Sequence, residues 1–205
     1  FVFACAHPDP KLRMLDRFLV ITEKQRVPAV IVANKIDLVE NAKELFGFYE
    51  PIGYRVIYTS TRTGVGVDEL HDTLKNKISA LAGPSGAGKS SLLNAIQPGL
   101  GLAVNEISTA MNKGRHTTVT RQMFPLVGGG YVADTPGWKS LALWDTEAVE
   151  MEAYFPELRD LVQGCQFSDC THTHEPNCAV LAAVKDGRVH PERFDSFLRL
   201  RAGQE

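Results

Sequence analysis

The residues from Gly83 to Ser90 form a regular chemical pattern. They read Gly-Pro-Ser-Gly-Ala-Gly-Lys-Ser and fit G-x-x-x-x-G-K-[S/T] at every fixed position. In such a loop, successive backbone N–H groups point inward and form an anion-binding nest. Lys89 would reach the outer phosphates of a nucleotide, and the Ser90 hydroxyl would ligate Mg²⁺. The expected nucleotide contacts in this stretch are Gly83, Pro84, Ser85, Gly86, Ala87, Gly88, Lys89, Ser90 and Ser91.

The residues on either side have the strand–loop–helix order that such a loop requires. An apolar run over residues 78–82 predicts a buried strand, and residues 91–96 predict a helix that begins at the loop. A glycine-rich turn that fits the pattern by chance is the alternative, and the strand–loop–helix context argues against it. The position is unusual, because a phosphate-binding loop normally lies near the start of its domain and this one begins at Gly83.

A second motif, Asn34-Lys35-Ile36-Asp37, fits N-K-x-D after the apolar run 28–33. The Asp37 carboxylate could accept hydrogen bonds from N1–H and N2–H₂ of guanine. Adenine lacks that pair of donors and would leave the carboxylate desolvated and unpaired. Asn34 and Lys35 would support the base and the neighbouring loop. Beside a phosphate-binding loop, this motif predicts GTP rather than ATP.

Ser60 lies in a polar loop, residues 59–61, that follows the predicted strand 55–59. A second guanine-reading loop would lie here and would use backbone N–H groups to reach the O6 atom of the base. We count Ser60 among the expected nucleotide contacts on this interpretation. A plain polar turn is the alternative.

The stretch Asp134-Thr135-Pro136-Gly137 fits D-x-x-G at the end of a predicted strand. Asp134 could hold Mg²⁺ through water, and the Gly137 N–H could contact a γ-phosphate. Thr117 and Thr118 precede this motif on a glycine-flanked segment, and one of the two hydroxyls could complete the Mg²⁺ shell; we favour Thr118. This loop would then become ordered with GTP and relax after hydrolysis.

The position after D-x-x-G bears on catalysis. Many GTPases place there a glutamine that orients the attacking water, whereas this chain has Trp138, whose indole cannot do so. The nearest polar candidate is His116, beside the switch threonines, which could position or deprotonate water. A loop histidine without a catalytic part is the alternative.

A cluster of cysteine and histidine near the C-terminus has the spacing of a metal site. Cys165, Cys170, His172 and Cys178 offer three thiolates and one imidazole, a set suited to a closed, structural Zn²⁺ site. His174 is a rival for His172, and reduced surface cysteines are the alternative to a metal. The fourth cysteine, Cys5, lies in an apolar run and is expected to be buried.

The order of elements predicts an α/β protein with a doubly wound, mostly parallel sheet, followed by a small helical zinc-binding domain. Helices are expected at 11–25, 42–48, 67–77, 179–184 and 191–201, and residues 122–127 and 131–133 are expected to pair antiparallel through a glycine turn. The composition change near residue 144 predicts domains over residues 1–143 and 144–205.

The overall composition is that of a globular protein. Of 205 residues, 44% are hydrophobic and 22% are charged, with a net charge of −2, so contact with nucleic acid must depend on local patches. No apolar run approaches the roughly 20 residues that span a bilayer. No basic leader precedes the strand-like run 1–6, and we expect the chain to be part of something longer.

The order of motifs, with N-K-x-D first, the phosphate-binding loop in the middle and D-x-x-G last, is a cyclic rotation of the usual GTPase order. With Gly114-Arg115-His116-Thr117-Thr118 and the cysteine–histidine cluster, it resembles the RsgA (YjeQ) family of circularly permuted GTPases over essentially the whole chain. The resemblance implies a P-loop GTPase that acts in maturation of the small (30S) ribosomal subunit, with His116 as its catalytic residue.

The resemblance also implies GTP or GDP with Mg²⁺, structural Zn²⁺, contact with ribosomal RNA, a cytoplasmic location, no membrane contact and a monomer. The family carries an oligonucleotide-binding barrel ahead of the GTPase domain, for which this chain has no residues, and its third switch threonine is Val119 here. We expect nucleotide state to set the orientation of the zinc domain on RNA. Candidate RNA contacts are Lys113, Arg115, Arg121, Lys185, Arg188, Arg193, Arg199 and Arg201; solvated surface charges are the alternative.

Two functions of other classes stay open at this point. The first is an ATP-dependent P-loop enzyme such as a kinase, which competition between GTP and ATP would reveal. The second is a non-catalytic zinc adaptor whose nucleotide site is only structural, which slow GTP hydrolysis would exclude.

Overall fold

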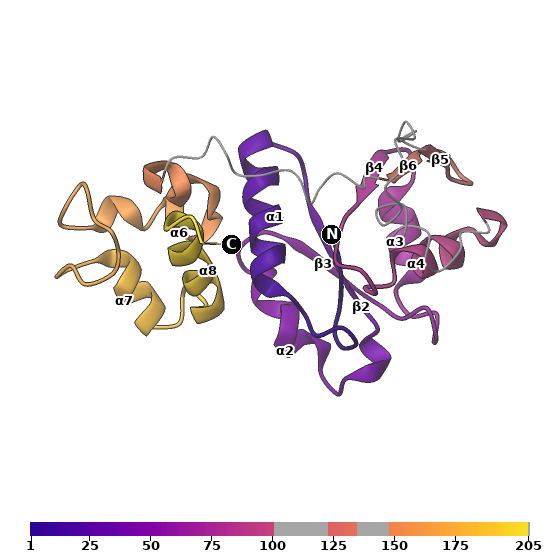
Figure 1. Ribbon diagram of the computed structural model, residues 1–205, viewed down its shortest axis with the longest axis horizontal. Coiled ribbons are helices and arrows are strands. Elements are labelled where there is room, and N and C mark those ends of the chain that lie inside the picture. Colours follow the sequence, from indigo (N-terminus) through magenta and orange to yellow (C-terminus); the bar gives the residue numbers. More distant parts are fainter. Residues whose placement is uncertain (101–122, 135–147, 205) are drawn as a thin grey trace, which may run out of the picture. The chain divides into compact units, whose positions relative to one another are not determined.

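The computed structural model describes residues 1–100, 123–134 and 148–204 (Figure 1). These residues form two compact units, each described here by itself. The first unit holds the described residues of Phe1–Lys11, Val30–Glu50 and Tyr54–Ala142. The second holds those of Leu12–Ala29, Pro51–Gly53 and Leu143–Glu205.

Three parallel strands form the first sheet of the first unit. They are β1 (Val2–Ala4), β2 (Val30–Asn34) and β3 (Arg55–Thr59), in the order β1-β2-β3. The middle strand is a continuous apolar run that ends in Asn34, as expected for a parallel strand covered on both faces. The predicted strands at 28–33 and 55–59 are therefore confirmed.

The second sheet has the order β4-β6-β5. Strand β4 (Ile78–Leu81) is parallel to β6 (Tyr131–Asp134), and β5 (Met123–Pro125) pairs antiparallel with β6. The Leu126 N–H donates to the Gly130 carbonyl and closes the glycine turn between β5 and β6. The predicted antiparallel pairing is confirmed.

The two sheets share one core. The Val2 N–H donates to the Ala82 carbonyl at 2.7 Å, so the backbone of β1 meets the chain that leaves β4. Helices α3 (Val67–Leu74) and α4 (Lys89–Ile96) pack against each other. The shared cluster of buried side chains is Val2, Val32, Ile57, Leu70, Leu74, Leu81, Ala87, Leu92, Leu93, Leu126 and Val132.

Two local predictions in this unit need correction. The helix predicted to reach Lys77 ends at Leu74, because Lys75 has an extended ψ of 135° and Asn76 then has a positive φ of 58°, neither of which a right-handed helix can include. Strand β4 was expected to be buried throughout, whereas Ile78 is 77% exposed. Alternate residues of a strand face opposite sides of the sheet, and the Ile78 side is open among the described residues.

Short helices complete the first unit. Helix α2 (Ala42–Phe46) begins after Asn41, whose side chain accepts the Lys43 N–H and caps the first turn. A short 3₁₀ helix, η2 (Gly47–Tyr49), continues from it, so the helix predicted over residues 42–48 is present in two pieces. Two further 3₁₀ turns are η1 (Ile36–Leu38) and η3 (Pro98–Leu100).

The second unit is helical. Its elements are α1 (Leu12–Gln25), η5 (Ala148–Tyr154), α6 (Pro156–Arg159), η6 (Val162–Gly164), α7 (Ala179–Lys185) and α8 (Pro191–Arg201). The predicted helices near 11–25, 179–184 and 191–201 are confirmed. Val20 of α1 lies in the same buried cluster as Phe155, Val180 and Phe197, so α1 packs within this unit although it lies between β1 and β2 in sequence. No helix in the described ranges combines the length and apolar character needed to cross a lipid bilayer.

Candidate nucleotide site and metal centre

Asn34 connects the N-K-x-D loop to the phosphate-binding loop. It ends β2 and is 1% exposed. Its amide Nδ2–H donates to the Ala87 carbonyl at 2.9 Å, and its Oδ1 accepts the Thr59 hydroxyl at 3.0 Å. Because parallel strands bring their carboxyl ends to one edge of a sheet, three loops far apart in sequence meet at this side chain.

The loop from Gly83 to Ser90 has little room for side chains at its glycines. A Cβ on Gly83 would lie 1.9 Å from the Val2 carbonyl oxygen, and one on Gly88 would lie 2.3 Å from Asn34 Nδ2. Both glycines also have positive φ, 153° and 95°. Both positions therefore require glycine for two reasons: another part of the chain lies too close for a Cβ, and the φ angle is positive.

Lys89 lies inside this loop. Its ammonium donates to the carbonyls of Gly83 and Pro84, both at 2.8 Å, and the residue is 9% exposed. Ser90 follows it in the first turn of α4, with Ser91 next to it. Pro84 and Ala87 are buried, whereas Ser85 and Gly86 at the tip are exposed. The positively charged Lys89 ammonium thus lies beside backbone N–H groups at the N-terminus of α4, an arrangement that attracts phosphate.

Asp37 is held by its neighbours. The Ser60 hydroxyl donates to Asp37 Oδ1 at 2.6 Å and accepts the backbone N–H groups of Arg62 and Thr63, both at 3.2 Å. The Ser60 N–H donates to the Val65 carbonyl at 3.0 Å. Ser60 therefore acts on the carboxylate through its side chain, a contact that the sequence did not reveal. Lys35 donates its ammonium to the His7 carbonyl.

The remaining predicted nucleotide residues fall largely outside the described ranges. His116, Thr118 and Gly137 all lie there. The backbone of Asp134 ends β6 opposite Leu81, close to the start of the phosphate-binding loop along β4. The D-x-x-G motif thus begins at the end of the strand that pairs with β4, beside the start of the phosphate-binding loop.

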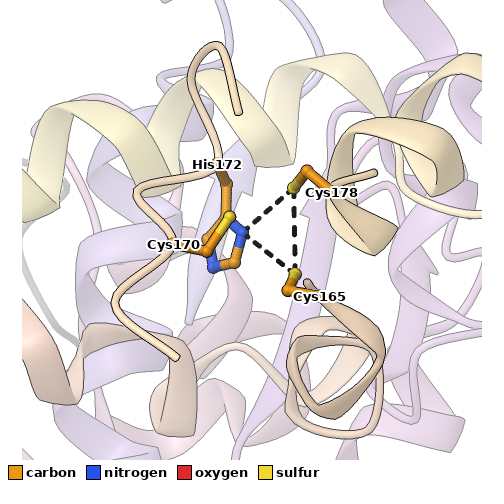
Figure 2. A group of neighbouring side chains, drawn as sticks. All are labelled: Cys165, Cys170, His172 and Cys178. Atoms are coloured by element: carbon orange, nitrogen blue, oxygen red, sulfur yellow. Dashed lines mark hydrogen bonds between the residues drawn. The ribbon is translucent and has the colours of Figure 1, made fainter. Parts of the chain in front are cut away.

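The cysteine–histidine cluster converges in the second unit (Figure 2). One ligand atom from each of Cys165, Cys170, His172 and Cys178 lies within 4.8 Å of the others. His172 Nδ1 is 3.6 Å from Cys165 Sγ and 3.2 Å from Cys178 Sγ, and the two sulfurs are 3.9 Å apart. Ligand atoms around tetrahedral Zn²⁺ are about 3.5–3.8 Å apart, so the donor set fits this metal.

The local backbone brings these ligands together. His172 has a positive φ of 60°, and Cys178 is the N-cap of α7, where its sulfur accepts the Leu181 N–H. Burial raises the pKa of the Cys170 thiol, so a bound metal ion would have to displace its proton. The rival ligand His174 is exposed and contacts the Thr173 hydroxyl through Nδ1. The geometry favours His172.

Two carboxylates support this cluster and were missed in the sequence. Glu152 Oε1 accepts from His172 Nε2 at 3.0 Å. Glu175 accepts the backbone N–H groups of Thr171, Thr173 and His174 and so shapes the loop that carries His172. Glu152 lies in an acidic stretch where no pattern distinguishes it from its neighbours.

The candidate RNA contacts need one correction. Arg193 is 1% exposed and is paired with Asp16 and Glu157, so the prediction that it contacts RNA is wrong. The sequence suggested a solvent-exposed side chain at this helical position, because the acidic partners Asp16 and Glu157 lie far away in sequence. Arg188 and Arg199 remain partly exposed beside acidic partners. Lys113, Arg115 and Arg121 lie outside the described residues.

A phosphate-binding loop in mid-chain, preceded by N-K-x-D and followed by D-x-x-G on a mostly parallel α/β sheet, defines a circularly permuted P-loop GTPase. The fold class predicted from the sequence is confirmed. The chain belongs to the RsgA GTPase family, whose model matches residues 1–144.

Curated relatives support this assignment over nearly the whole chain. One from Gemmatimonas aurantiaca, named small ribosomal subunit biogenesis GTPase RsgA, is 52% identical over 202 residues, covering 98% of this chain and 66% of the relative. One of the same name from Moorella thermoacetica is 46% identical over 204 residues, covering 98% and 70%. The chain spans about two thirds of the length of these relatives.

Solved structures agree with the curated relatives. YjeQ from Thermotoga maritima superposes with a TM-score of 0.82 at 39% identity, covering 98% of this chain and 69% of that one. YloQ, described as a circularly permuted GTPase, superposes with a TM-score of 0.75 at 33% identity, covering 99% and 66%. The predicted family resemblance is thereby confirmed.

Proposed function

We propose that this chain binds GTP and Mg²⁺ and hydrolyses GTP to GDP. The observation that carries the proposal is the set of hydrogen bonds from Ser60 to Asp37, from Thr59 to Asn34 and from Asn34 to Ala87. These bonds link a carboxylate suited to guanine with a loop suited to phosphates. The other expected contacts are Lys35, Gly83, Pro84, Ser85, Gly86, Gly88, Lys89, Ser90, Ser91 and Gly137.

The hydrolytic step would use residues around the γ-phosphate. Ser90, Thr118 and Asp134 would hold Mg²⁺, which when bound would neutralise charge on the transferred phosphoryl group. His116 would orient or deprotonate the attacking water. Lys89 would move from its carbonyl contacts to the outer phosphates. In this proposal residues 1–143 are the GTPase domain, in accord with the range that the family model matches.

We assign residues 144–205 as a zinc-binding domain in which Cys165, Cys170, His172 and Cys178 hold structural Zn²⁺. Four protein ligands leave no open position, so the metal would stabilise the fold and perform no chemistry. The burial of Cys170, His172 and Cys178 supports this role.

The names of the relatives suggest the biological setting. They are called small ribosomal subunit biogenesis GTPases. We propose that this chain likewise acts in the cytoplasm as a monomer in late maturation of the small ribosomal subunit, where nucleotide state switches its contact with ribosomal RNA. Co-sedimentation with small subunits in a GTP analogue but not in GDP would support the switch, and equal binding in both would contradict it.

The nucleotide proposal is tested by base specificity. Asp37→Asn should lose its preference for GTP over ATP and gain affinity for XTP, because xanthine has a carbonyl where guanine has the N2 amino group. Glu40→Gln, a change at an exposed carboxylate in the same region, is the matched control and should leave affinities unchanged. Lys89→Ala should abolish GTP hydrolysis. Unchanged GTP preference in Asp37→Asn would remove Asp37 from the site.

A further inference from the structure

The two ring nitrogens of His172 have different surroundings. Nδ1 faces the sulfurs of Cys165 and Cys178, at 3.6 and 3.2 Å. Nε2 lies 3.0 Å from Glu152 Oε1 on the other side of the ring. The side chain of His172 is 2% exposed, so water cannot easily replace Glu152 as the partner of Nε2.

We infer that Glu152 is a positioning residue for the metal site. As an acceptor it places the proton of the neutral imidazole on Nε2 and leaves the lone pair on Nδ1, where the thiolates converge. Histidines that ligate metals commonly donate their other N–H to a carboxylate, which fixes the tautomer and the ring orientation. This inference rests on the proposed zinc site.

Arg201 holds Glu152 in place. Its Nη1 donates to Glu152 Oε1 at 3.0 Å and lies 3.4 and 3.3 Å from the carbonyls of Cys170 and Thr171. One guanidinium at the end of α8 thus contacts both the carboxylate behind His172 and the backbone of the ligand loop. Loss of Arg201 would free Glu152 to leave Nε2 and would loosen the loop at the same time.

The ring of His172 is also restrained by packing. Its centroid is 5.9 Å from that of Phe197, which lies one turn before Arg201 on α8. Packing limits the position of the ring but does not choose between its tautomers, because both have the same shape. The choice of nitrogen therefore falls to the hydrogen bond with Glu152.

A simple ion pair between a protonated His172 and Glu152 is the competing interpretation. In that case both ring nitrogens carry protons and Nδ1 cannot bind a metal ion. The two interpretations differ in metal affinity and in the state of Nδ1, so both quantities should be measured on the chain with zinc added.

The first experiment measures zinc affinity by competition with a chromogenic chelator. Glu152→Ala should bind zinc about 10–100-fold more weakly than the wild type, because a buried N–H loses its acceptor. Glu152→Gln should lose less, since its carbonyl oxygen still accepts from Nε2, and Arg201→Ala should also lose less. Glu150→Gln is the matched control, an exposed carboxylate in the same 3₁₀ helix, and should not change the affinity.

The second experiment reads the ring directly by ¹⁵N NMR of histidine-labelled, zinc-loaded protein. The wild type and Glu152→Gln should show Nδ1 bound to metal and a proton on Nε2. If Glu152 had a purely structural role, the Glu152 and Arg201 variants would be less stable than the wild type but would keep its zinc affinity and its His172 tautomer. If Glu152→Ala does not fold, the zinc affinities of Glu152→Gln and Arg201→Ala test the positioning role instead.

The outcomes separate the two proposals. If the wild type binds no zinc, the metal site itself falls. If the wild type binds zinc and Glu152→Ala binds it equally tightly, or if Nε2 is the coordinated nitrogen, only the positioning role of Glu152 is overturned.

Discussion

Arg193 donates from Nη1 to Asp16 Oδ1 across 2.7 Å, and the two residues are 1% and 0% exposed. The same guanidinium donates to both oxygens of Glu157, at 2.7 and 3.1 Å, and lies over the Phe155 ring. One buried cation therefore joins α8 to α1 and to α6. Helix α1 is tied in this way to the C-terminal helices of the unit that carries the cysteine–histidine cluster.

We expect Arg193→Met to lower the free energy of unfolding by about 3–5 kcal/mol, because two buried carboxylates lose their cation. Urea denaturation of the whole chain measures the change. The control is Arg199→Met on the same helix. Arg199 pairs with Asp195, whose side chain is 43% exposed, so loss of this ion pair should cost about 0–1 kcal/mol. Combining Arg193→Met with Asp16→Leu and Glu157→Met should restore much of the loss, since no charge is then left buried. Equal effects of Arg193→Met and Arg199→Met would contradict the prediction.

Ser60→Ala should weaken GTP binding roughly tenfold to a hundredfold, because the charged Asp37 carboxylate loses the hydroxyl that donates to it and the N–H groups of the following loop lose their acceptor. Titration with a fluorescent guanine nucleotide measures this. Thr63→Ala, which keeps the backbone N–H that contacts Ser60, is the control and should bind as the wild type does. If the two variants bind equally well, Ser60 does not position Asp37.

Metal removal should change the reactivity of the cysteines in a defined order. With zinc bound, a thiol reagent should modify few cysteines, since Cys165, Cys170 and Cys178 are ligands and Cys5 is 3% exposed. After chelation the three ligands should react, whereas Cys5 should react only on denaturation. Mass spectrometry identifies the modified residues, and Cys5→Ala should leave the number exposed by chelation unchanged. Rapid reaction of all three ligands before chelation would argue against a bound metal.

The loop that carries His172 should show an acid-sensitive contact. Hydrogen bonds from the Thr171 hydroxyl, and from backbone N–H groups including that of Thr171, hold the pKa of Glu175 well below its usual range. Because the folded-state pKa is lowered, the stabilisation is fully present above the unfolded value of about 4.3 and is lost as pH falls from there toward the folded value.

The carboxyl ¹³C shift of Glu175, followed by NMR during acidification, should have its midpoint below the ordinary glutamate value of about 4.3. A midpoint at that ordinary value would mean that the hydrogen bonds do not hold in solution. Glu175→Gln should speed amide exchange at Thr173 and His174 at neutral pH, because an amide offers one acceptor oxygen where the carboxylate offers two.

The sheet and its loops were predictable because each motif directly follows an apolar run. Parallel strands put their carboxyl ends at one edge, so Asn34 and Ala87 meet although they are 53 positions apart. The spacing of the cysteines likewise predicted that Cys165, Cys170, His172 and Cys178 lie together. It left His174 as a rival for His172, because the choice between them depends on the backbone turn at His172.

The packing of α1 and the burial of Arg193 were not predictable. Helical periodicity shows that α1 has an apolar face but not which helices cover it. Arg193 lies among charged residues in a helix, where a solvated side chain is the ordinary expectation. Its partner Asp16 is 177 positions away, and no local pattern connects them. Glu152 was missed for the same reason.

The packing of α1 with the C-terminal helices has a consequence for synthesis. Translation proceeds from the N-terminus, so α1 is made long before α8 and lacks its native partners until α8 has been made. Closing a loop of 177 positions costs chain entropy, and contacts so distant in sequence form slowly. The three parallel strands β1, β2 and β3 can pair early, whereas Asp16 and Val20 stay hydrated until α8 is released from the ribosome. Folding of the second unit is therefore expected to follow the pairing of these strands and to recruit α1, a helix made well before its partners.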